Sequence, residues 1–366
     1  MEYTISTLGS HSALDVCEGA KKEGFKTLVA CQKGREKTYL QYYLNRKRKA
    51  AGKAQSVGCI DEVLLLNKFG DIVDQKNIQF MQKRNCIFVP NRSFAVYVGY
   101  DNIENRFPVP IFGNKFLLRA EERDAEKNQY YLMDKAGIRR PKEINSPDKI
   151  DRLVIVKVSE AKRTYERAFF LARSYEEYKK KSSELLAMGK ITPEGLKKAK
   201  IEEYIVGAHF NFNFFYSKVH EELELLGIDT RRQANLDGYL RMPADQQLEL
   251  LKYQQPSIIE VGHIACTLRE SLLEQVFTLG EKLVAACEKE YAPGLIGPFA
   301  LQGAISEEGK EDFVCFDISF RMPGSPGTRF TPYSEYLYGE GISFGRRVAM
   351  EIRDAKKKKL AGQITT

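Results

Sequence analysis

The strongest constraint on the fold is a series of four short apolar runs in the first third of the sequence, each followed by a longer segment with helical periodicity. The runs are Thr4–Leu8, Thr27–Cys31, Glu62–Leu66 and Cys86–Pro90. Apolar runs of this length are typical of buried strands, and their alternation with helices indicates βαβ units. The sequence therefore predicts an α/β fold that begins with a doubly wound parallel sheet.

Polar side chains follow the first and the fourth of these runs. Ser10, His11 and Ser12 come directly after the first, and Asn91-Arg92-Ser93-Phe94 follows the fourth. In open α/β sheets, ligands gather at the carboxyl ends of the strands, where helix N-termini present unpaired N–H groups to anions. His11 and Ser93 are therefore candidate ligand contacts. A turn histidine and a helix N-cap serine are the structural alternatives.

The remainder of the chain is richer in strands, which predicts an α+β arrangement there. A charged segment, Ser159–Arg167, is the predicted loop between strands Leu153–Val158 and Ala168–Leu171. The other predicted strands are Ile201–Gly207, Asn211–Tyr216, Leu223–Ile228, Gly297–Ile305 and Asp312–Ser319, and the predicted helices are Ala13–Lys22, Asp124–Ala136, Ser174–Leu186 and Ser271–Lys289. The last two strands are expected to pair as a hairpin, so that Gln302 and Asp317 face one another.

Composition limits the classes of protein to which this chain can belong. Hydrophobic residues make up 43% and charged residues 29% of the chain, which is ordinary for a folded globular protein. No run approaches the roughly 18 uncharged apolar residues that span a bilayer. We therefore expect a cytoplasmic protein without a membrane partner. Seven cysteines without Cys-x-x-Cys spacing favour buried, reduced thiols.

The formal net charge of +8 indicates either an anionic partner or solvated basic faces. Much of the excess lies in the runs Arg46–Lys49, Lys179–Lys181 and Lys356–Lys359. Because such runs are usually solvated, and because aromatic-rich basic stripes are absent from the sequence, we expect a small anionic ligand and no nucleic-acid partner. A nucleotide sensor or RNA-binding module is the weakest alternative, and it predicts strongly salt-dependent polyanion binding without turnover.

A nucleotide site is indicated by three features in a fixed order along the chain. Lys157 ends a strand, Glu202-Glu203-Tyr204-Ile205 lies in a later strand, and Gln302 and Asp317 lie on the final hairpin. Lysine neutralises phosphate, strand backbone binds adenine, and oxygen side chains hold magnesium. Together with the leading βαβ domain, this order resembles the ATP-grasp superfamily. A strand-end lysine that covers apolar surface is the alternative for Lys157.

Within that superfamily, the sequence resembles the formate-dependent 5-formaminoimidazole-4-carboxamide ribonucleotide synthetases of archaeal-type purine biosynthesis. The segments that carry the resemblance are Thr7–His11, Val89–Phe94, Phe112–Asn114, Val154–Lys157, Ile201–Gly207, Asn235–Gly238, Arg269–Leu273 and Gly297–Gln302. The resemblance implies a ligase of IMP biosynthesis that uses ATP and formate to formylate 5-aminoimidazole-4-carboxamide ribonucleotide through formyl phosphate. It implies Mg²⁺ or Mn²⁺ as the metal, and we further expect a homo-oligomer.

The resemblance also assigns roles to individual residues. The matched positions are His11, Ser93 and His263 for the ribonucleotide, Lys157, Glu202, Glu203, Tyr204 and Ile205 for ATP, Gln302 and Asp317 for the metal, and Lys157 and Arg321 for catalysis. The structural alternatives are a core position for His263 and a simple ion pair between Asp317 and Arg321. The implied domains are an N-terminal Rossmann-like substrate-binding domain (1–122), an ATP-grasp lid (123–200) and a C-terminal ATP-grasp subdomain (201–366).

Two departures from the family pattern leave other interpretations open. Ser159–Arg167 contains no glycine where a glycine-rich phosphate flap is common, so Lys162, Arg163 or Arg167 would have to supply charge instead. Asp317 stands where glutamate is common, and the shorter carboxylate makes bidentate bridging harder. The alternatives are a divergent ATP-grasp ligase for another carboxylate and amine, or a non-catalytic nucleotide-binding paralogue.

Overall fold

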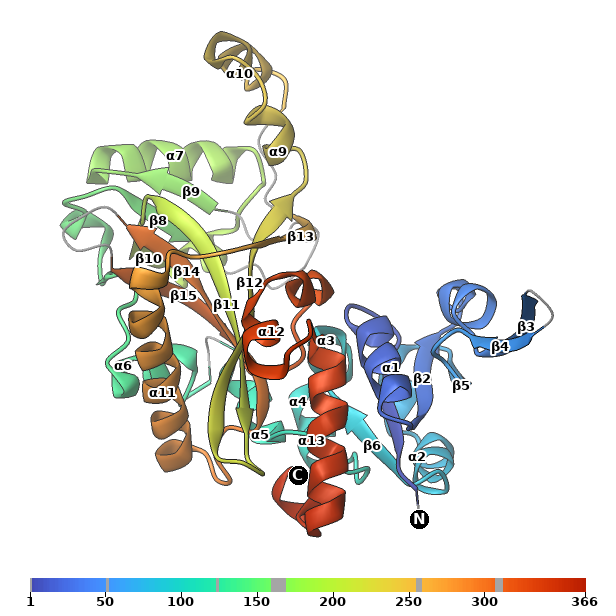
Figure 1. The fold of residues 1–366 in the computed structure, drawn as a ribbon. Coiled ribbons are helices and arrows are strands. Elements are labelled where there is room, and N and C mark those ends of the chain that lie inside the picture. The colour runs from blue at the N-terminus through green and yellow to red at the C-terminus, as the bar shows by residue number, and fades with distance from the viewer. Residues whose placement is uncertain (1, 51–52, 123–124, 159–168, 255–258, 307–311) are drawn as a thin grey trace.

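The computed structural model describes residues 2–50, 53–122, 125–158, 169–254, 259–306 and 312–366. Its N-terminal part is built on a four-stranded parallel sheet in the order β5-β2-β1-β6. The strands are β1 (Thr4–Leu8), β2 (Lys26–Gln32), β5 (Glu62–Leu66) and β6 (Cys86–Val89) (Figure 1). The four strands predicted from the apolar runs are therefore confirmed. The central strand β1 is buried along its whole length, which explains its unbroken apolar pattern.

Helix α1 (Ala13–Lys22) connects β1 to β2, and α2 (Gln75–Gln82) lies between β5 and β6. Three more short helices follow β6, namely α3 (Arg92–Val98), α4 (Tyr100–Asn105) and α5 (Lys115–Ala120). Helix α3 begins after Asn91, whose side chain accepts a hydrogen bond from the Phe94 N–H at 3.1 Å. The alternative in which Ser93 caps this helix is therefore wrong, because the asparagine two residues earlier takes that role.

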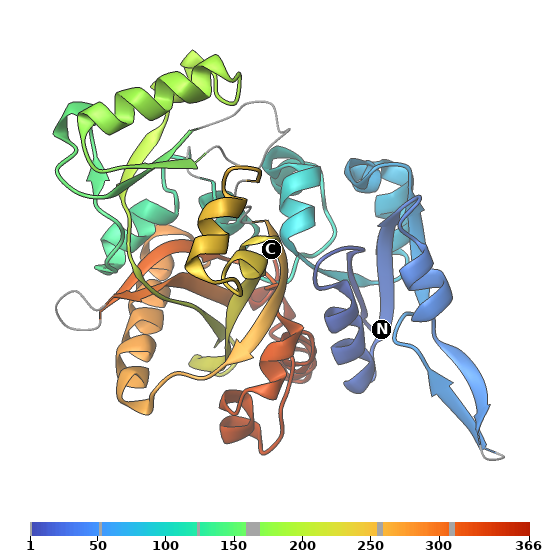
Figure 2. The ribbon, with the colours of Figure 1, turned by 90° about the horizontal axis from the view of Figure 1, so that it is seen from above.

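A two-stranded antiparallel ribbon projects from the N-terminal domain, away from the rest of the molecule (Figures 1 and 2). It consists of β3 (Arg46–Ala50) and β4 (Lys53–Val57). We expected a solvated basic face at Arg46–Lys49, and the side chains of Arg46, Lys47 and Arg48 are exposed. Their place on a projecting ribbon was not predicted, because the run lacks the apolar alternation of a half-buried strand.

The central part of the chain forms a second sheet in the order β7-β10-β8-β9. Its strands are β7 (Glu143–Ile144), β8 (Val154–Lys157), β9 (Phe169–Ala172) and β10 (Lys200–Glu203), and its helices are α7 (Tyr175–Ala187) and α8 (Pro193–Lys197). The predicted antiparallel pairing of β8 with β9 is confirmed. The predicted loop Ser159–Arg167, with Lys162, Arg163 and Arg167, lies outside the described residues.

Helix α6 (Gln129–Ala136) precedes this sheet and is shorter than predicted. Its start is fixed by Asn128, whose side chain accepts hydrogen bonds from the N–H groups of Tyr130 and Tyr131 at 3.0 and 3.1 Å. The predicted end at Gly137 is confirmed, because that residue adopts the left-handed conformation that closes the helix.

The C-terminal part is built on a five-stranded antiparallel sheet in the order β13-β12-β11-β14-β15. The strands are β11 (Gly207–Ser217), β12 (Glu222–Gln233), β13 (Glu260–Cys266), β14 (Gly297–Ser306) and β15 (Phe313–Ser319), and helix α11 (Leu273–Glu290) packs against one face. Phe212, Phe214 and Phe299 are fully buried between sheet and helix. Gln302 and Asp317 are paired across β14 and β15, as predicted.

The segment Ile201–Gly207, predicted as a strand that enters a connection, is a strand only as far as Glu203. Strand β10 ends at Glu203 in the central sheet, and β11 begins at Gly207 in the C-terminal sheet. Tyr204, Ile205 and Val206 form the connection between the two sheets. An apolar run cannot reveal where a chain leaves one sheet and joins another, because both strands carry the same residue types.

The remaining helices are α9 (Leu236–Tyr239), α10 (Ala244–Leu250), α12 (Tyr333–Tyr338) and α13 (Phe344–Lys358). Helices α9 and α10 form an arm that stands away from the sheets between β12 and β13 (Figure 1). None of the helices in the described ranges combines the length and the apolar character that crossing a bilayer requires.

Helix α13 returns to the N-terminal domain and packs against α1. At the contact, a Cβ on Gly19 would lie 2.0 Å from the Arg346 backbone nitrogen, and a Cβ on Gly345 would lie 2.0 Å from the Asp15 carbonyl oxygen. Residues 364–366 then pair with the segment around Ile111, which itself lies beside β6. The predicted domain boundaries at 122 and 200 stay a prediction. The contacts of α13 and residues 364–366, however, place residues 344–366 against the first domain.

Candidate active site

Two strand tips of the parallel sheet are joined by hydrogen bonds. The side-chain amide of Asn91 donates to the carbonyl oxygens of Leu8 and Ser10, at 2.8 and 3.1 Å. The hydroxyl oxygens of Ser93 and Ser10 lie 2.8 Å apart. The asparagine therefore fixes the two tips at one edge of the sheet, with His11 beside them.

The loop after β15 closes onto these tips. The Ser12 hydroxyl donates to the carbonyl oxygen of Pro323, and the Met322 N–H donates to the Pro90 carbonyl oxygen at 3.2 Å. Gly324 lies directly against the imidazole ring of His11, because a Cβ at that position would be 2.1 Å from Cε1 of the ring. The N-terminal tips and the segment that follows the final hairpin thus share one location.

His11 is neutral near pH 7. Its backbone has a φ of 49°, the left-handed conformation that turns the chain from β1 into α1. Its side chain keeps an exposed edge, while the surrounding protein removes much of the water around the ring. This desolvation, and next the positive charge of Arg321, lower the pKa of His11 below its ordinary value. A neutral imidazole can both donate and accept a hydrogen bond.

His263 on β13 is in the opposite state. Its Nδ1 lies 2.5 Å from Asp229 Oδ2, and its Nε2 lies 2.7 Å from Glu260 Oε1. Burial works against the charged form, but the hydrogen bonds to these two carboxylates outweigh it and raise the pKa of His263 to about 9. The same network lowers the pKa of Glu260 to about 2 against its own desolvation. The histidine is therefore a cation held between two anions.

Two asparagines of β11 complete the shell around Asp229. The side-chain amides of Asn211 and Asn213 donate to the two carboxylate oxygens of Asp229, at 2.9 and 2.6 Å. Asp229 is only 1% exposed, so these bonds replace the water that a buried carboxylate loses. The sequence signal that we overlooked is the pair of asparagines at alternate positions of an otherwise aromatic strand, which places both on one face.

The predicted metal positions lie next to this network. Arg231 Nε lies 2.9 Å from Glu260 Oε2, and the same guanidinium donates to Gln302 Oε1. The Gln302 amide donates to the Ser319 hydroxyl at 3.0 Å. The Asp317 carboxylate makes no hydrogen bond or ion pair within the described part of the chain. Among the described residues, no three His, Cys, Asp or Glu side chains are grouped to hold a metal ion.

Arg321 is held by a glutamate that the sequence did not single out. Its Nε lies 3.3 Å from Glu121 Oε2, and Arg92 Nη1 lies 3.3 Å from the same oxygen. The other Glu121 oxygen accepts from the Phe320 N–H at 2.9 Å. Glu121 is 8% exposed and so places two arginines beside the strand tips. The alternative pairing of Asp317 with Arg321 does not occur.

The predicted phosphate-binding lysine is paired inside the central sheet. Lys157 Nζ contacts Glu202 Oε2, and the Tyr130 hydroxyl donates to Glu202 Oε1 at 3.1 Å. The Glu202 side chain is 5% exposed and that of Lys157 is 13% exposed. Glu202 is therefore directed at the lysine, and it can hold the ammonium in place.

The connection between the two sheets presents free backbone. Glu203 accepts the Lys142 N–H at 3.2 Å, and the Tyr204 N–H donates to the Leu153 carbonyl oxygen at 3.0 Å. The N–H groups of Ile205 and Val206 make no hydrogen bond to the described residues. Ile205 itself packs in an apolar cluster with Ala304 and Val314. The segment thus offers backbone hydrogen-bond donors beside an apolar surface. This combination suits the binding of a flat heterocycle.

Comparison with known proteins identifies the family. Residues 5–144 match a protein of unknown function (DUF1246), and residues 177–366 match a domain of unknown function (DUF1297). A 5-formaminoimidazole-4-carboxamide-1-(beta)-D-ribofuranosyl 5'-monophosphate synthetase from Methanopyrus kandleri is 39% identical over 366 residues, covering 100% of this chain and 95% of the relative. The synthetase of the same name from Methanothermobacter thermautotrophicus is 41% identical over 368 residues, with 100% and 95% covered. The chain belongs to this synthetase family.

Solved structures agree with this assignment. An IMP biosynthesis protein, PurP, from Thermococcus kodakaraensis has a TM-score of 0.72 and 30% identity, covering 99% of this chain and 100% of that one. An ADP complex of N5-carboxyaminoimidazole ribonucleotide synthetase has a TM-score of 0.59 at 11% identity, covering 93% and 78%, and so shows the fold alone. The synthetase family is one of ATP-dependent ligases, and the fold is ATP-grasp, as the sequence predicted.

The residues expected from the synthetase family fall into three groups in the structure. His11, Ser93 and Arg321 come together at the strand tips, and Arg231 joins His263 to Gln302 through Glu260. Lys157 and Glu202 form a separate group in the central sheet. Sequence reasoning missed Asn91, Glu121, Tyr130, Asn211, Asn213, Asp229, Arg231 and Glu260, which hold the expected residues in place.

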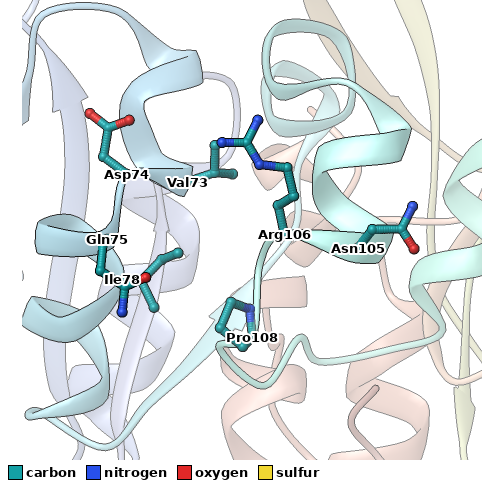
Figure 3. Close-up of a pocket in the computed structure, with 7 residues that line it drawn as sticks. All are labelled: Val73, Asp74, Gln75, Ile78, Asn105, Arg106 and Pro108. Atoms are coloured by element: carbon teal, nitrogen blue, oxygen red, sulfur yellow. The ribbon is translucent and has the colours of Figure 1, made fainter.

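A cavity of about 440 Å³ lies elsewhere, between the start of α2 and the segment after α4 (Figure 3). It is lined by Val73, Asp74, Gln75, Ile78, Asn105, Arg106 and Pro108. None of these residues was a predicted site residue. The strand tips are the better candidate for substrate binding, because they gather the hydroxyl, imidazole and guanidinium groups that recognise a nucleotide.

Proposed function

We propose that this protein uses ATP and formate to formylate 5-aminoimidazole-4-carboxamide ribonucleotide, in the path to IMP. The observation that carries the proposal is the full-length relationship, at about 40% identity, to proteins named as synthetases of the formylated product. The contact between His11 and Gly324 supports it, because it brings the proposed ribonucleotide contacts to the hairpin that carries the proposed metal positions.

The chemistry requires formate to be activated. Formate is a poor acyl donor because its carboxylate oxygen is a poor leaving group. Transfer of the γ-phosphoryl group of ATP to that oxygen gives formyl phosphate and ADP. The 5-amino nitrogen of the ribonucleotide then forms a bond to the formyl carbon, the carbon–oxygen bond to phosphate breaks, and the amine loses a proton. The weak aryl amine makes positioning and charge neutralisation the main contributions of the protein.

The ribonucleotide is assigned to His11, Ser93 and His263. The neutral imidazole of His11 and the paired hydroxyls of Ser10 and Ser93 supply hydrogen bonds at the tips of adjacent strands. Both ring nitrogens of His263 are already hydrogen-bonded to carboxylates. Its contribution to ribonucleotide binding is therefore its positive charge and the positioning of Glu260.

ATP is assigned to Lys157 and to the segment Glu202–Ile205. Lys157 neutralises phosphate charge, with Glu202 and Tyr130 fixing its ammonium. The free N–H groups after Tyr204 face adenine, and Ile205 supports the ring. In this assignment, Glu202 acts through Lys157 and does not touch the nucleotide base.

Asp317 and Gln302 suit Mg²⁺ or Mn²⁺ to different degrees. The carboxylate of Asp317, which makes no hydrogen bond or ion pair with the described residues, is a hard oxygen ligand, whereas the Gln302 oxygen is already engaged by Arg231. Magnesium keeps several waters and binds through few carboxylates together with substrate phosphates, so such a sparse set of ligands fits it. When bound, the metal neutralises phosphate charge. Arg321 supplies a further fixed positive charge for the transferring phosphoryl group.

The cellular setting and assembly are part of the same proposal. We infer a cytoplasmic location, which is supported by seven cysteines that are all free. We also infer a homo-oligomer. Size measurement by light scattering tests the oligomer, and a mass equal to one chain of 41.8 kDa would contradict it.

ADP release under controlled substrate supply tests the reaction. Purified protein with ATP and Mg²⁺ is expected to form ADP, in step with formylated ribonucleotide, when formate and the aminoimidazole ribonucleotide are both present. Omission of either should reduce ADP to the background rate. ADP formation at the same rate with and without the ribonucleotide would contradict the proposal. Turnover with another carboxylate and amine, but not with this pair, would instead establish a divergent ATP-grasp ligase.

A further inference from the structure

Nearly all the excess positive charge of the chain lies in one short segment. Residues 33–57 contain eight basic residues and one acidic residue, a net charge of +7 out of +8 for the whole chain. The basic residues are Lys33, Arg35, Lys37, Arg46, Lys47, Arg48, Lys49 and Lys53. The other basic runs of the chain are balanced by acidic residues elsewhere, so this segment stands out as an electrostatic feature.

The structure gathers six of these charges, those with described side chains, on the projecting ribbon β3–β4 and at its base. Figures 1 and 2 show the ribbon extending away from the antiparallel sheet that carries the proposed metal positions. Six of the cations have described side chains, and all six are exposed without a carboxylate within ion-pair distance in the described part of the chain. The single acid, Glu36, forms no ion pair with these cations in the described part of the chain.

Aromatic rings are exposed at the base of the ribbon. Tyr42 and Tyr43 are 55% and 45% exposed, and Lys37 Nζ lies 5.9 Å from the ring centroid of Tyr42. The backbone there is fixed, because the Tyr43 carbonyl oxygen accepts from the N–H groups of Cys59 and Ile60 at 3.0 and 3.1 Å. The rings therefore stand at a defined place beside the cations.

We propose that the ribbon and its base bind single-stranded nucleic acid, a function separate from the ligase reaction. Unpaired cations on a projecting ribbon neutralise backbone phosphates. Exposed tyrosine rings stack on bases, whichever base is presented, and this combination is typical of sequence-tolerant single-strand binding. Acidic proteins and anionic bilayers would satisfy the cations but offer no flat partner to the rings. The proposal replaces our sequence-based expectation of no nucleic-acid partner.

Charge neutralisation on the ribbon tests the electrostatic part. The variant Lys33→Gln/Lys47→Gln/Arg48→Gln removes side chains that make no hydrogen bond or ion pair in the described structure. Binding of a fluorescein-labelled oligouridine of about 16 nucleotides is followed by anisotropy over a range of salt concentrations. The slope of log affinity against log salt should become shallower by about 2, because each lost phosphate contact removes about 0.7.

A matched variant separates location from net charge. Lys356→Gln/Lys357→Gln/Lys359→Gln removes three positive charges from the exposed run at the end of α13 and should leave the salt slope unchanged. Both variants should keep wild-type ADP formation, which shows that they are folded. An equal loss of slope in the two variants would overturn the proposal, because it would mean that only total charge matters.

Removal of the rings tests the stacking part. Tyr42→Ala/Tyr43→Ala should weaken oligouridine binding by about tenfold or more while the salt slope stays at its wild-type value. Unchanged affinity would overturn the assignment to single strands. Two further probes, polyglutamate and phosphatidylserine vesicles, complete the test on the wild-type protein. Binding of polyglutamate as tightly as oligouridine would overturn the proposal in favour of an acidic protein partner. Tighter binding of the vesicles than of oligouridine would overturn it in favour of a bilayer.

Discussion

At the scale of single residues, the two histidines near the proposed ribonucleotide site differ in charge, because His11 is neutral and His263 is positively charged. His11 lies among arginines and is desolvated, and both effects lower its pKa. His263 is less exposed than His11 but contacts two carboxylates, which raise its pKa to about 9. Residue type alone predicted neither state, because the partners of His263 come from β12 and from its own strand, three residues away.

The charge on His263 predicts a pH dependence of stability. Its pKa is about 9 in the folded protein and near 6.5 when unfolded, so its contribution is complete below about pH 6.5 and is lost as the pH rises through 9. We expect the free energy of unfolding to fall by on the order of 3 kcal/mol over that window, and to fall less in His263→Gln. Denaturant titrations from pH 6 to pH 10 measure this. Parallel pH profiles for the two proteins would contradict the assignment.

The buried pair of Lys157 and Glu202 predicts separate effects on rate and stability. Lys157→Met should lower the rate of ADP formation by about one hundredfold or more, because a positioned positive charge is lost. It should also destabilise the fold by about 3 kcal/mol, because Glu202 becomes a buried carboxylate without its cation.

The double variant Lys157→Met/Glu202→Gln distinguishes the two effects. It should recover most of the stability, since the uncompensated charge is gone, but none of the rate. Chemical denaturation and steady-state kinetics on the three proteins provide the comparison. Recovery of turnover in the double variant would mean that Lys157 serves the fold and not the reaction.

At the scale of elements, the apolar runs in the sequence predicted most of the strands, and they failed for strands that contain no such run. The strands around β1 and β11 carry long apolar runs because both faces are covered, and these were found. The ribbon β3–β4 and the edge strand β13 lack such runs, because the described side chains of the ribbon are largely exposed and those of β13 are mostly half-buried, and these strands were missed. For the site, the family motifs indicated the expected residues but not their partners, such as Asp229 and Arg231 on β12, which lie outside those motifs in the sequence.

The loop after β15 predicts a specific steric effect on ribonucleotide binding. Gly324→Ala would place a methyl group 2.1 Å from the His11 ring, so the imidazole must move. We expect the apparent KM for the ribonucleotide to rise by about tenfold while the KM for ATP stays near its wild-type value. Gly327→Ala in the same loop is the control, because a Cβ there meets nothing within 4 Å. A rise in both KM values would indicate general disruption of the loop.

At the scale of the whole molecule, the first domain is completed by residues far along the chain. Ile111 exchanges two backbone hydrogen bonds with Thr366, at 3.0 and 2.9 Å, and the Gly113 N–H donates to the Ile364 carbonyl oxygen at 3.0 Å. Ile364 is fully buried in the core that also holds Ile5 and Phe112. The segment therefore acts as an additional edge of the N-terminal sheet.

Removal of residues 364–366 should lower the free energy of unfolding by about 4 kcal/mol, the combined scale of three backbone hydrogen bonds and one buried isoleucine. The loss should appear as a lower denaturant midpoint, together with weaker ribonucleotide binding, because the tips that hold His11 belong to the same domain. Thr365→Ala, which keeps the backbone pairing, is the control. An unchanged midpoint after truncation would show that this edge contributes little.

The return of α13 and residues 364–366 to α1 and Ile111 also determines when the molecule can mature during its synthesis. During translation, β1 to β6 are synthesised long before α13 and residues 364–366, which cover them. The apolar faces of α1 and β6 therefore remain uncovered while more than half of the protein is still being translated. Nascent chains are therefore expected to depend on protection until this late segment leaves the exit tunnel. Permuted genes that start with α13 would shorten that interval.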